Sequence, residues 1–305
     1  MIRFIFKRIL ETIPVLWAVA TITFFMLRLA PGGPFDDERQ VSPEVLRTLQ
    51  AHYGLDKPLM AQYGDYLLNL LKGDLGPSFK YPGRTVNEII RDSFPNSMEL
   101  GFYSMSIALA LGLTLGILAS LKPNSLLDYL PSSMAMVGIC LPTFVLGPLL
   151  VLVFALKLQW FPYPGWDTPA TKVLPSLTLG AYYAAYIARL TRGGMREILT
   201  QDFIRTARAK GASARVIVLR HALRGGLLPV VSFMGPAFAG LVAGSFVIET
   251  IFNVPGLGKH FVTSAFNRDY TMVLGLVLFF ATLIVVFNTL VDILQVWLNP
   301  KLKLS

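Results

Sequence analysis

Residues 272–297 read MVLGLVLFFATLIVVFNTLVDILQVW, a run of 26 residues that contains one charged side chain, Asp292. An α-helix rises 1.5 Å per residue, so about 20 apolar residues cross the roughly 30 Å hydrocarbon core of a bilayer. This stretch is long enough and apolar enough to do so. It predicts a transmembrane helix, and with it an all-α membrane protein.

Five further apolar stretches accompany it. They cover about residues 9–29, 98–121, 130–156, 174–190 and 227–248. The composition agrees, because 15% of the residues are charged, against about a quarter in soluble domains. We therefore predict a polytopic membrane protein with six transmembrane helices. The fourth stretch is the weakest, being short and rich in Tyr and Ala.

The first stretch follows Arg3, Lys7 and Arg8 and could also be read as a signal peptide. It is longer than the apolar part of a typical signal peptide, and it contains Arg28. It ends in Pro31-Gly32-Gly33-Pro34 without a small-residue cleavage site. We therefore interpret it as a retained transmembrane helix, with Arg28 reaching the lipid headgroups.

The charges set the expected orientation. Residues 189–226 hold nine Lys and Arg against two acidic residues, whereas residues 31–97 hold seven against nine. Cytoplasmic loops carry an excess of Lys and Arg. This rule places residues 191–226, called the basic loop below, and both termini in the cytoplasm. It requires the fourth span, and it accounts for the net charge of +9 without nucleic acid.

The chain accordingly divides into an N-terminal end with the first helix (1–30), an outer segment (31–97), a five-helix core containing the basic loop (98–297) and a cytoplasmic tail (298–305). Ser42-Pro43 and Pro58 predict helix starts within the outer segment, and Gly73 predicts a stop. We interpret this segment as a cap over the span ends. A docking face for an external partner is the open alternative.

The basic loop has internal order. Asp202 is the expected N-cap of a short helix that Gly211 ends, and Ala207 and Ala209 are small enough for close approach to a partner. A second amphipathic helix is expected at about residues 214–223. The pattern alone favours two interpretations equally: a surface that docks on a partner, or a charged loop that fixes topology and touches anionic lipid.

The run Phe203-Ile204-Arg205-Thr206-Ala207-Arg208-Ala209-Lys210-Gly211, followed by Arg220-His221-Ala222-Leu223 and Leu228-Pro229, resembles the EAA-type loop of binding-protein-dependent ABC importer permeases. Arg205, Thr206 and Ala207 occupy the E-A-A places, and Gly211 the place of the family glycine. Arg and Thr replace the generic Glu and Ala, a departure that is typical of the peptide and nickel branch.

Other stretches resemble the same branch. They are Gly73-Asp74-Leu75-Gly76-Pro77-Ser78, the segment from Glu249 to Gly258, Arg268-Asp269-Tyr270 and the tail Asn299-Pro300-Lys301. The resemblance covers essentially the whole chain. It points most closely to the oligopeptide permeases of Gram-negative bacteria.

The resemblance implies the type I permease fold of ABC importers, in the bacterial inner membrane. The implied partners are a second, homologous permease subunit, two cytoplasmic ABC ATPases and a periplasmic peptide-binding protein. The residues implied to dock on an ATPase are Asp202, Phe203, Arg205, Thr206, Ala207, Arg208, Ala209, Lys210, Gly211, Arg220 and His221. Those expected near the translocation path or an outer gate are Glu249, Asn253, Pro255 and Gly256.

We expect no catalytic, cofactor-binding or metal-binding residue in the chain. It lacks a Gly-x-x-x-x-Gly-Lys-Ser/Thr run, so ATP and Mg would be bound by the partner ATPases. His52, His221 and His260 fall in separate loops, and the lone Cys140 is interpreted as a packing residue.

Two other functions stay open. A stand-alone channel or proton-driven carrier is disfavoured, because Glu99, Glu249 and Asp292 fall near span ends instead of mid-bilayer. Interhelical or interfacial hydrogen bonding is favoured for Glu99 and Asp292, and is nearer even for Glu249. Within the family, a nickel permease is the alternative.

Overall fold

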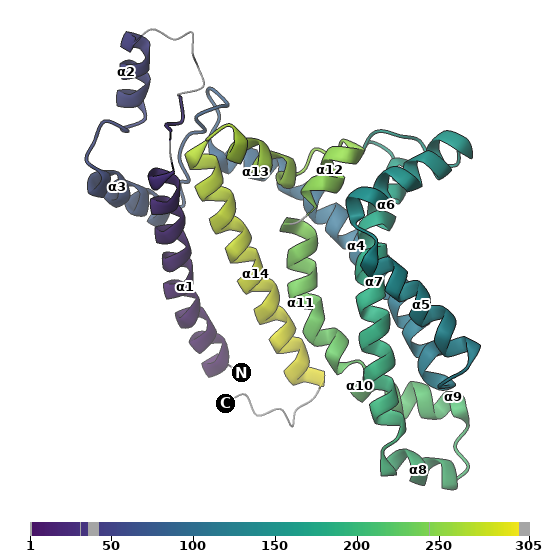
Figure 1. Cartoon of the computed structure of the whole chain (residues 1–305). Coiled ribbons are helices and arrows are strands. Elements are labelled where there is room, and N and C mark those ends of the chain that lie inside the picture. The colour runs from purple at the N-terminus through teal and green to yellow at the C-terminus, as the bar shows by residue number, and fades with distance from the viewer. Residues whose placement is uncertain (1, 31, 36–42, 244, 299–305) are drawn as a thin grey trace. The chain divides into compact units, whose positions relative to one another are not determined.

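The computed structural model of the chain describes residues 2–30, 32–35, 43–243 and 245–298 (Figure 1). These residues form helices, joined by turns and one isolated bridge between Pro77 and Thr85, and no strand. The all-α prediction is confirmed. Three helical segments, Leu10–Leu29, Val86–Leu121 and Tyr270–Gln295, are long and apolar enough to cross a membrane. The number is five if each of two bent helix pairs, Leu126–Cys140 with Thr143–Lys157 and Ala214–Gly226 with Leu228–Ala243, counts as one span.

The elements follow one another along the chain as α1 (Ile2–Leu29), α2 (Pro43–His52), α3 (Leu59–Leu71), α4 (Val86–Leu121), α5 (Leu126–Cys140), α6 (Thr143–Leu150), the π-helix η1 (Val151–Lys157), α7 (Pro169–Leu199), α8 (Asp202–Ala209), α9 (Ala214–Val216), the π-helix η2 (Ile217–Ala222), α10 (Leu223–Gly226), α11 (Leu228–Ala243), α12 (Phe246–Phe252), α13 (Leu257–Phe266) and α14 (Tyr270–Leu298).

The chain forms two compact units. Unit 1 comprises residues 1–95 and 259–283, and unit 2 comprises residues 96–258 and 284–305. The long helices α4 and α14 each contribute one part to each unit.

The third predicted span is broken, and the expectation of one continuous helix over residues 130–156 is wrong. Helix α5 ends at Cys140, and Pro142 caps a new helix, α6, that continues as η1. The two parts meet at 105°. Proline has no N–H to donate, and it disfavours helical backbone at the residue before it, which explains a break at Leu141-Pro142.

The fourth predicted span, residues 174–190, lies within α7, a much longer helix that is not among these candidate membrane spans. Thr168 caps the start of α7, with Pro169 at the first helical position, and the helix runs for 31 residues to Leu199. Within unit 2, α7 contacts α5, α6, α10, α11 and α12. Its first half and middle lie in the core, so packing inside the fold stabilises it. The helix therefore continues nine residues beyond the predicted span.

Small residues let the helices of unit 2 approach closely. A Cβ on Gly112 of α4 would lie 2.7 Å from Ile187, and one on Gly116 would lie 2.5 Å from Thr191, both on α7. Such close backbone contact through small residues is typical of helix pairs in membranes. It holds α4 and α7 together around a core that includes Leu100, Leu174, Ile187, Leu241 and Phe252.

In unit 1, the segment after α3 is held on Asp269. The Asp269 carboxylate accepts hydrogen bonds from the Ser78 hydroxyl and from the backbone N–H groups of Phe79 (3.2 Å) and Lys80 (3.3 Å). The predicted helix start at Pro58 and stop at Gly73, which has a φ of +75°, are confirmed. Helix α2 begins at Pro43, and Ser42 lies outside the described residues.

The Arg28 side chain packs against other side chains of unit 1, and its contact with lipid headgroups stays a prediction. Its guanidinium lies 4.9 Å from the ring centre of Phe24 and 5.2 Å from that of Tyr270, and its Nε donates to Gln62. Helix α3 and Tyr270 therefore cover the side chain within unit 1.

We expect the stability of unit 1 to fall in weak acid because of His260. Its ring lies edge-on to Tyr81, and burial, with the charges of Arg84 and Lys259, lowers its pKa. The unfolded pKa is about 6.5, so the stabilising contribution is complete above that pH and is lost as the pH falls through the lower folded pKa. Melting temperatures from pH 7.5 to 5 should fall less steeply for His260→Gln. Parallel curves for the two proteins would contradict this assignment.

Candidate coupling loop and turn 249–258

Helix α8 forms where the sequence predicts a short helix in the basic loop. It covers Asp202–Ala209, and Gly211 follows with a φ of +81°, the left-handed conformation that ends helices. The expected N-cap is wrong by one residue. Gln201 is the N-cap, and Asp202 is the first helical residue, where its carboxylate accepts from Arg205 at 3.2 Å. A carboxylate in the first turn still favours the helix through its dipole.

The basic loop packs on itself through a narrow apolar stripe. Ile204 of α8 is fully buried and Ile217 of η2 is 4% exposed, and the two helices contact each other. The second predicted helix is present, but it extends from Ala214 through η2 to Gly226. The first nine residues of the predicted loop, 191–199, are instead the end of α7.

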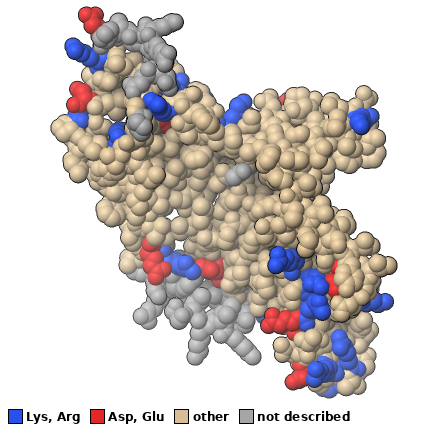
Figure 2. Space-filling model, viewed as in Figure 1, with Lys and Arg blue, Asp and Glu red and all other residues tan. Residues whose placement is uncertain are grey.

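The opposite surface of the loop exposes both apolar and basic side chains. Phe203 is 50% exposed, Val216 42% and Leu219 57%. Lys and Arg gather at the end of unit 2 that α8 and α9 form (Figure 2). Among the predicted docking residues Ala207 is half-buried, and the others are exposed: Asp202, Phe203, Arg205, Thr206, Arg208, Ala209, Lys210, Gly211, Arg220 and His221. Exposed apolar side chains within a basic surface suit a partner interface.

An ion-pair cluster that the sequence analysis missed joins α5 to the end of α7. Asp128 has a 2% exposed side chain, and it accepts from Arg192 (Nη2 to Oδ2, 3.0 Å) and from the Asn124 N–H. Arg196 lies 4.0 Å away. Arg192 and Arg196 are four residues apart, so on a helix they lie on one face. A sequence pattern could therefore have indicated a paired cationic site, had α7 been predicted to continue past residue 190.

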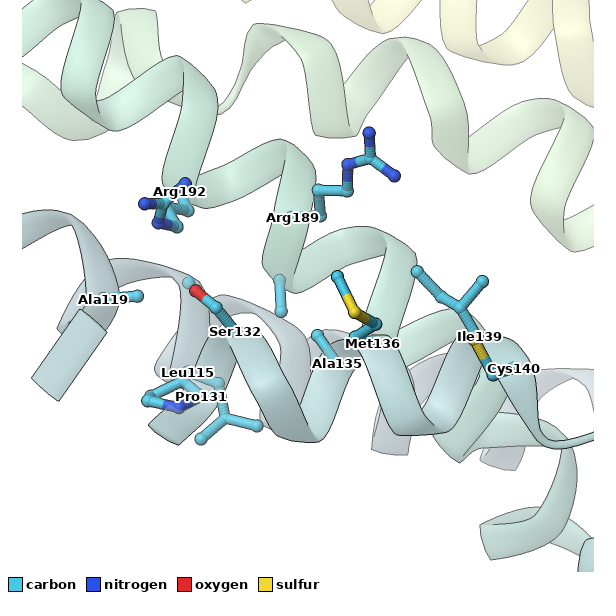
Figure 3. Close-up of a pocket in the computed structure, with 12 residues that line it drawn as sticks. Leu115, Ala119, Pro131, Ser132, Ala135, Met136, Ile139, Cys140, Arg189 and Arg192 are labelled. Carbon is cyan, nitrogen blue, oxygen red and sulfur yellow. The ribbon is translucent and has the colours of Figure 1, made fainter. Parts of the chain in front are cut away.

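The cluster borders an apolar cavity of about 550 Å³ between α4, α5 and α7 (Figure 3). Figure 3 shows Arg192 beside Ser132 at one end of the row of lining residues, and Ile139 and Cys140 at the other. Cys140 is exposed, so its interpretation as a packing residue is wrong.

The four residues predicted near the path lie together at the end of α12 and in its connection to α13, a segment called turn 249–258 below. Glu249 is fully buried and accepts from the hydroxyls of Ser97 (2.8 Å) and Ser245 (2.5 Å). Asn253 ends α12 in the left-handed conformation, and the Pro255 carbonyl accepts from Asn96 at 3.0 Å. Turn 249–258 is thus organised around an inward-pointing Glu249.

Substituting Gly256 by alanine should destabilise turn 249–258. A Cβ at this position would lie 2.5 Å from the Glu249 carboxylate, which its two serine partners hold in place. Overpacking of this kind costs roughly 1–3 kcal/mol, and we expect a lower melting temperature. Gly193→Ala is the matched control, because its Cβ meets nothing within 4 Å. Equal melting temperatures for the two variants would show that the turn accommodates the added methyl group without a loss of stability.

Glu99 makes the interhelical contacts predicted for it. Lys172 of α7 donates to its carboxylate at 2.7 and 2.9 Å, and the Trp166 indole N–H donates at 3.2 Å. Within the described ranges no three His, Cys, Asp or Glu side chains are close enough to hold a metal ion. His52, His221 and His260 lie on α2, η2 and α13.

Comparison with known proteins agrees with this fold. The family described as "Binding-protein-dependent transport system inner membrane component" matches residues 112–304, and the corresponding N-terminal family matches residues 1–101. The inward-facing MetNI methionine ABC transporter has a similar fold, with a TM-score of 0.58 at 18% identity over 69% of this chain and 96% of that chain.

Three relatives are similar over nearly the whole length. The oligopeptide transport system permease protein OppB of Salmonella typhimurium is 50% identical and that of Haemophilus influenzae 49%, each over 99% of this chain and 100% of the relative. The dipeptide transport system permease protein DppB of Bacillus subtilis is 42% identical over 100% of this chain and 99% of the relative. The chain therefore belongs to the family of inner membrane components of binding-protein-dependent transport systems.

Proposed function

We propose that this chain is a permease subunit of an ATP-driven ABC importer that carries oligopeptides across the bacterial inner membrane. The observation that carries the proposal is the 49–50% identity, over the full length, to permeases named for oligopeptide transport. The exposed apolar and basic surface of α8 and η2 supports the assignment.

In this proposal the basic loop docks on a cytoplasmic ATPase. Phe203 and Leu219 offer apolar contact area, and Arg205, Arg208 and Lys210 surround it with positive charge. The buried side chains of Ile204 and Ile217 hold α8 and η2 together on the side away from this surface. Two residues, Thr200 and Gln201, connect α7 to α8. Movement of the ATPase would therefore be passed to α7. ATP binding shifts the equilibrium between the inward-open and outward-open states only to the extent that ATP binds the two states with different affinity.

The remaining assignments belong to the same proposal. A second, homologous permease encloses the path with this chain, a periplasmic peptide-binding protein delivers the cargo, and both termini are cytoplasmic. This subunit is non-catalytic, and its partner ATPases bind ATP and Mg. Six spans and the division at residues 30, 97 and 297 stay part of the prediction. Turn 249–258 shapes the outer end of the path, with Glu249 acting from inside the fold.

The test is uptake by the reconstituted complex. Liposomes holding this chain, the second permease, the ATPases and the binding protein should accumulate labelled tri- to pentapeptides when ATP is present. Accumulation of nickel instead would assign the chain to the other branch of the family. Transport by the purified chain alone, without ATP, would support a stand-alone channel or carrier and overturn the proposal.

A further inference from the structure

Arg28 in unit 1 has no counter-ion among the residues that the structure describes. No carboxylate of the described residues forms an ion pair with it: Asp65 pairs with Lys57 at 2.6 Å, and Asp74 caps the Gly76 N–H at 2.9 Å. The guanidinium Nε donates to the Gln62 oxygen at 3.1 Å. A charge held in a partly buried place is costly unless an opposite charge accompanies it.

Two buried donor groups beside Phe24 have no hydrogen-bond partner among the described residues. They are Nη1 of Arg28 and the hydroxyl of Tyr66. Burial raises the pKa of Tyr66 to about 12, so the hydroxyl keeps its proton at neutral pH. Gln62 and Tyr66 are four residues apart on α3 and therefore lie on one face of it. The Tyr66 ring also stacks on Phe24 at 5.6 Å, the ring that Arg28 covers.

Both donors belong to residues that line one cavity of about 350 Å³ in unit 1. Its lining is mixed, with polar side chains such as His52 and Asn69 beside apolar ones, and it also includes Lys57 and the carboxylates of Asp65 and Asp74. A cavity of this size holds a small ligand or the end of a longer one.

We propose that this cavity binds a carboxylate group, which accepts hydrogen bonds from Arg28 and Tyr66. A carboxylate presents two oxygens in one plane, which suits a guanidinium N–H and a neighbouring hydroxyl, and it supplies a negative charge that no described residue pairs with Arg28. Water could satisfy the donors but would not supply the charge. The carboxylate has two sources, a small carboxylate ion or the C-terminus of a peptide, and the peptide source rests on the proposed function.

The experiment measures melting temperatures of the purified permease–ATPase complex in nanodiscs of neutral lipid at constant ionic strength. The probes are sodium acetate, trialanine and trialanine amide. A ligand that binds only the folded state raises the melting temperature. We expect a saturable rise with acetate and trialanine and none with the amide. A rise with trialanine alone would also support the site and assign it to peptides.

Two variants and one matched control locate the effect. Arg28→Gln and Tyr66→Phe should each weaken the apparent affinity at least tenfold. Tyr63→Phe should not, because the Tyr63 hydroxyl is already bonded to Thr21 and Tyr63 does not line the cavity. Both variants are compared with their own melting temperatures without ligand, so a general loss of stability does not imitate the result.

Three results would overturn the proposal: no rise in the wild type, an equal rise in Arg28→Gln, or an equal rise with the amide. A rise that appears only with anionic phospholipid, and with neither carboxylate, would assign the cavity to a phosphate headgroup and also overturn it. Failure of peptide transport leaves the acetate result unaffected, so the site and the proposed function are tested separately.

Discussion

Replacing Phe203 by aspartate should weaken the binding of the ATPases about 30-fold and reduce ATP-driven uptake, while the permease stays in the membrane. The Phe203 side chain is 50% exposed at the start of α8, and fully buried Ile204 anchors the helix from the other side. Truncation of a central aromatic contact in an interface costs about 2 kcal/mol or more, which is roughly 30-fold in affinity. A new carboxylate would also be desolvated in the interface.

The measurement is the amount of ATPase that co-purifies with the tagged permease, together with peptide-stimulated ATP hydrolysis. Leu71→Asp is the matched control, since Leu71 is 85% exposed at the end of α3, outside the basic loop. It should retain the ATPases at the wild-type level. Wild-type retention and uptake by Phe203→Asp would refute the docking role of α8.

Replacing Asp128 by asparagine should lower the stability of unit 2 by roughly 1–3 kcal/mol, because it removes charge-assisted hydrogen bonds to a buried carboxylate. Arg192 and Arg196, whose side chains are 33% and 38% exposed, can still be hydrated. The Asp128 side chain is 2% exposed and lies between Arg192, Arg196 and the Asn124 N–H. Asparagine keeps the shape but loses the charge. Because Arg192 and Arg196 lie in the last turns of α7 before α8, we also expect weaker coupling of ATP hydrolysis to uptake.

Thermal unfolding of the complex measures this effect. Arg189→Gln is the matched control on the same helix, because Arg189 is exposed and forms no ion pair with the described carboxylates. The double variant Asp128→Asn/Arg192→Gln should lose less stability than the two single losses combined, since both remove the same interaction. A wild-type melting temperature for Asp128→Asn would show that the pair contributes nothing.

Local features of the chain were predictable because local physics produces them. The apolar runs predict membrane helices through their length and hydropathy, and α1, α4 and α14 contain three such segments. Helix α8 and its end at Gly211 follow from the alternation of small, apolar and basic residues and from the left-handed backbone that glycine adopts.

Contacts between distant residues were decided by the tertiary structure alone. No local pattern relates Asp128 to Arg192, Arg28 to Gln62, or Glu249 to Ser97, because each pair is joined by packing of separate helices. The last turns of α7 likewise depend on distant residues: they pack against α10, and α5 supplies a carboxylate for their arginines. Composition and spacing thus determined which segments are helices and which loop is basic. Burial and pairing decided where those helices bend and end, and which charged side chains lie inside the fold.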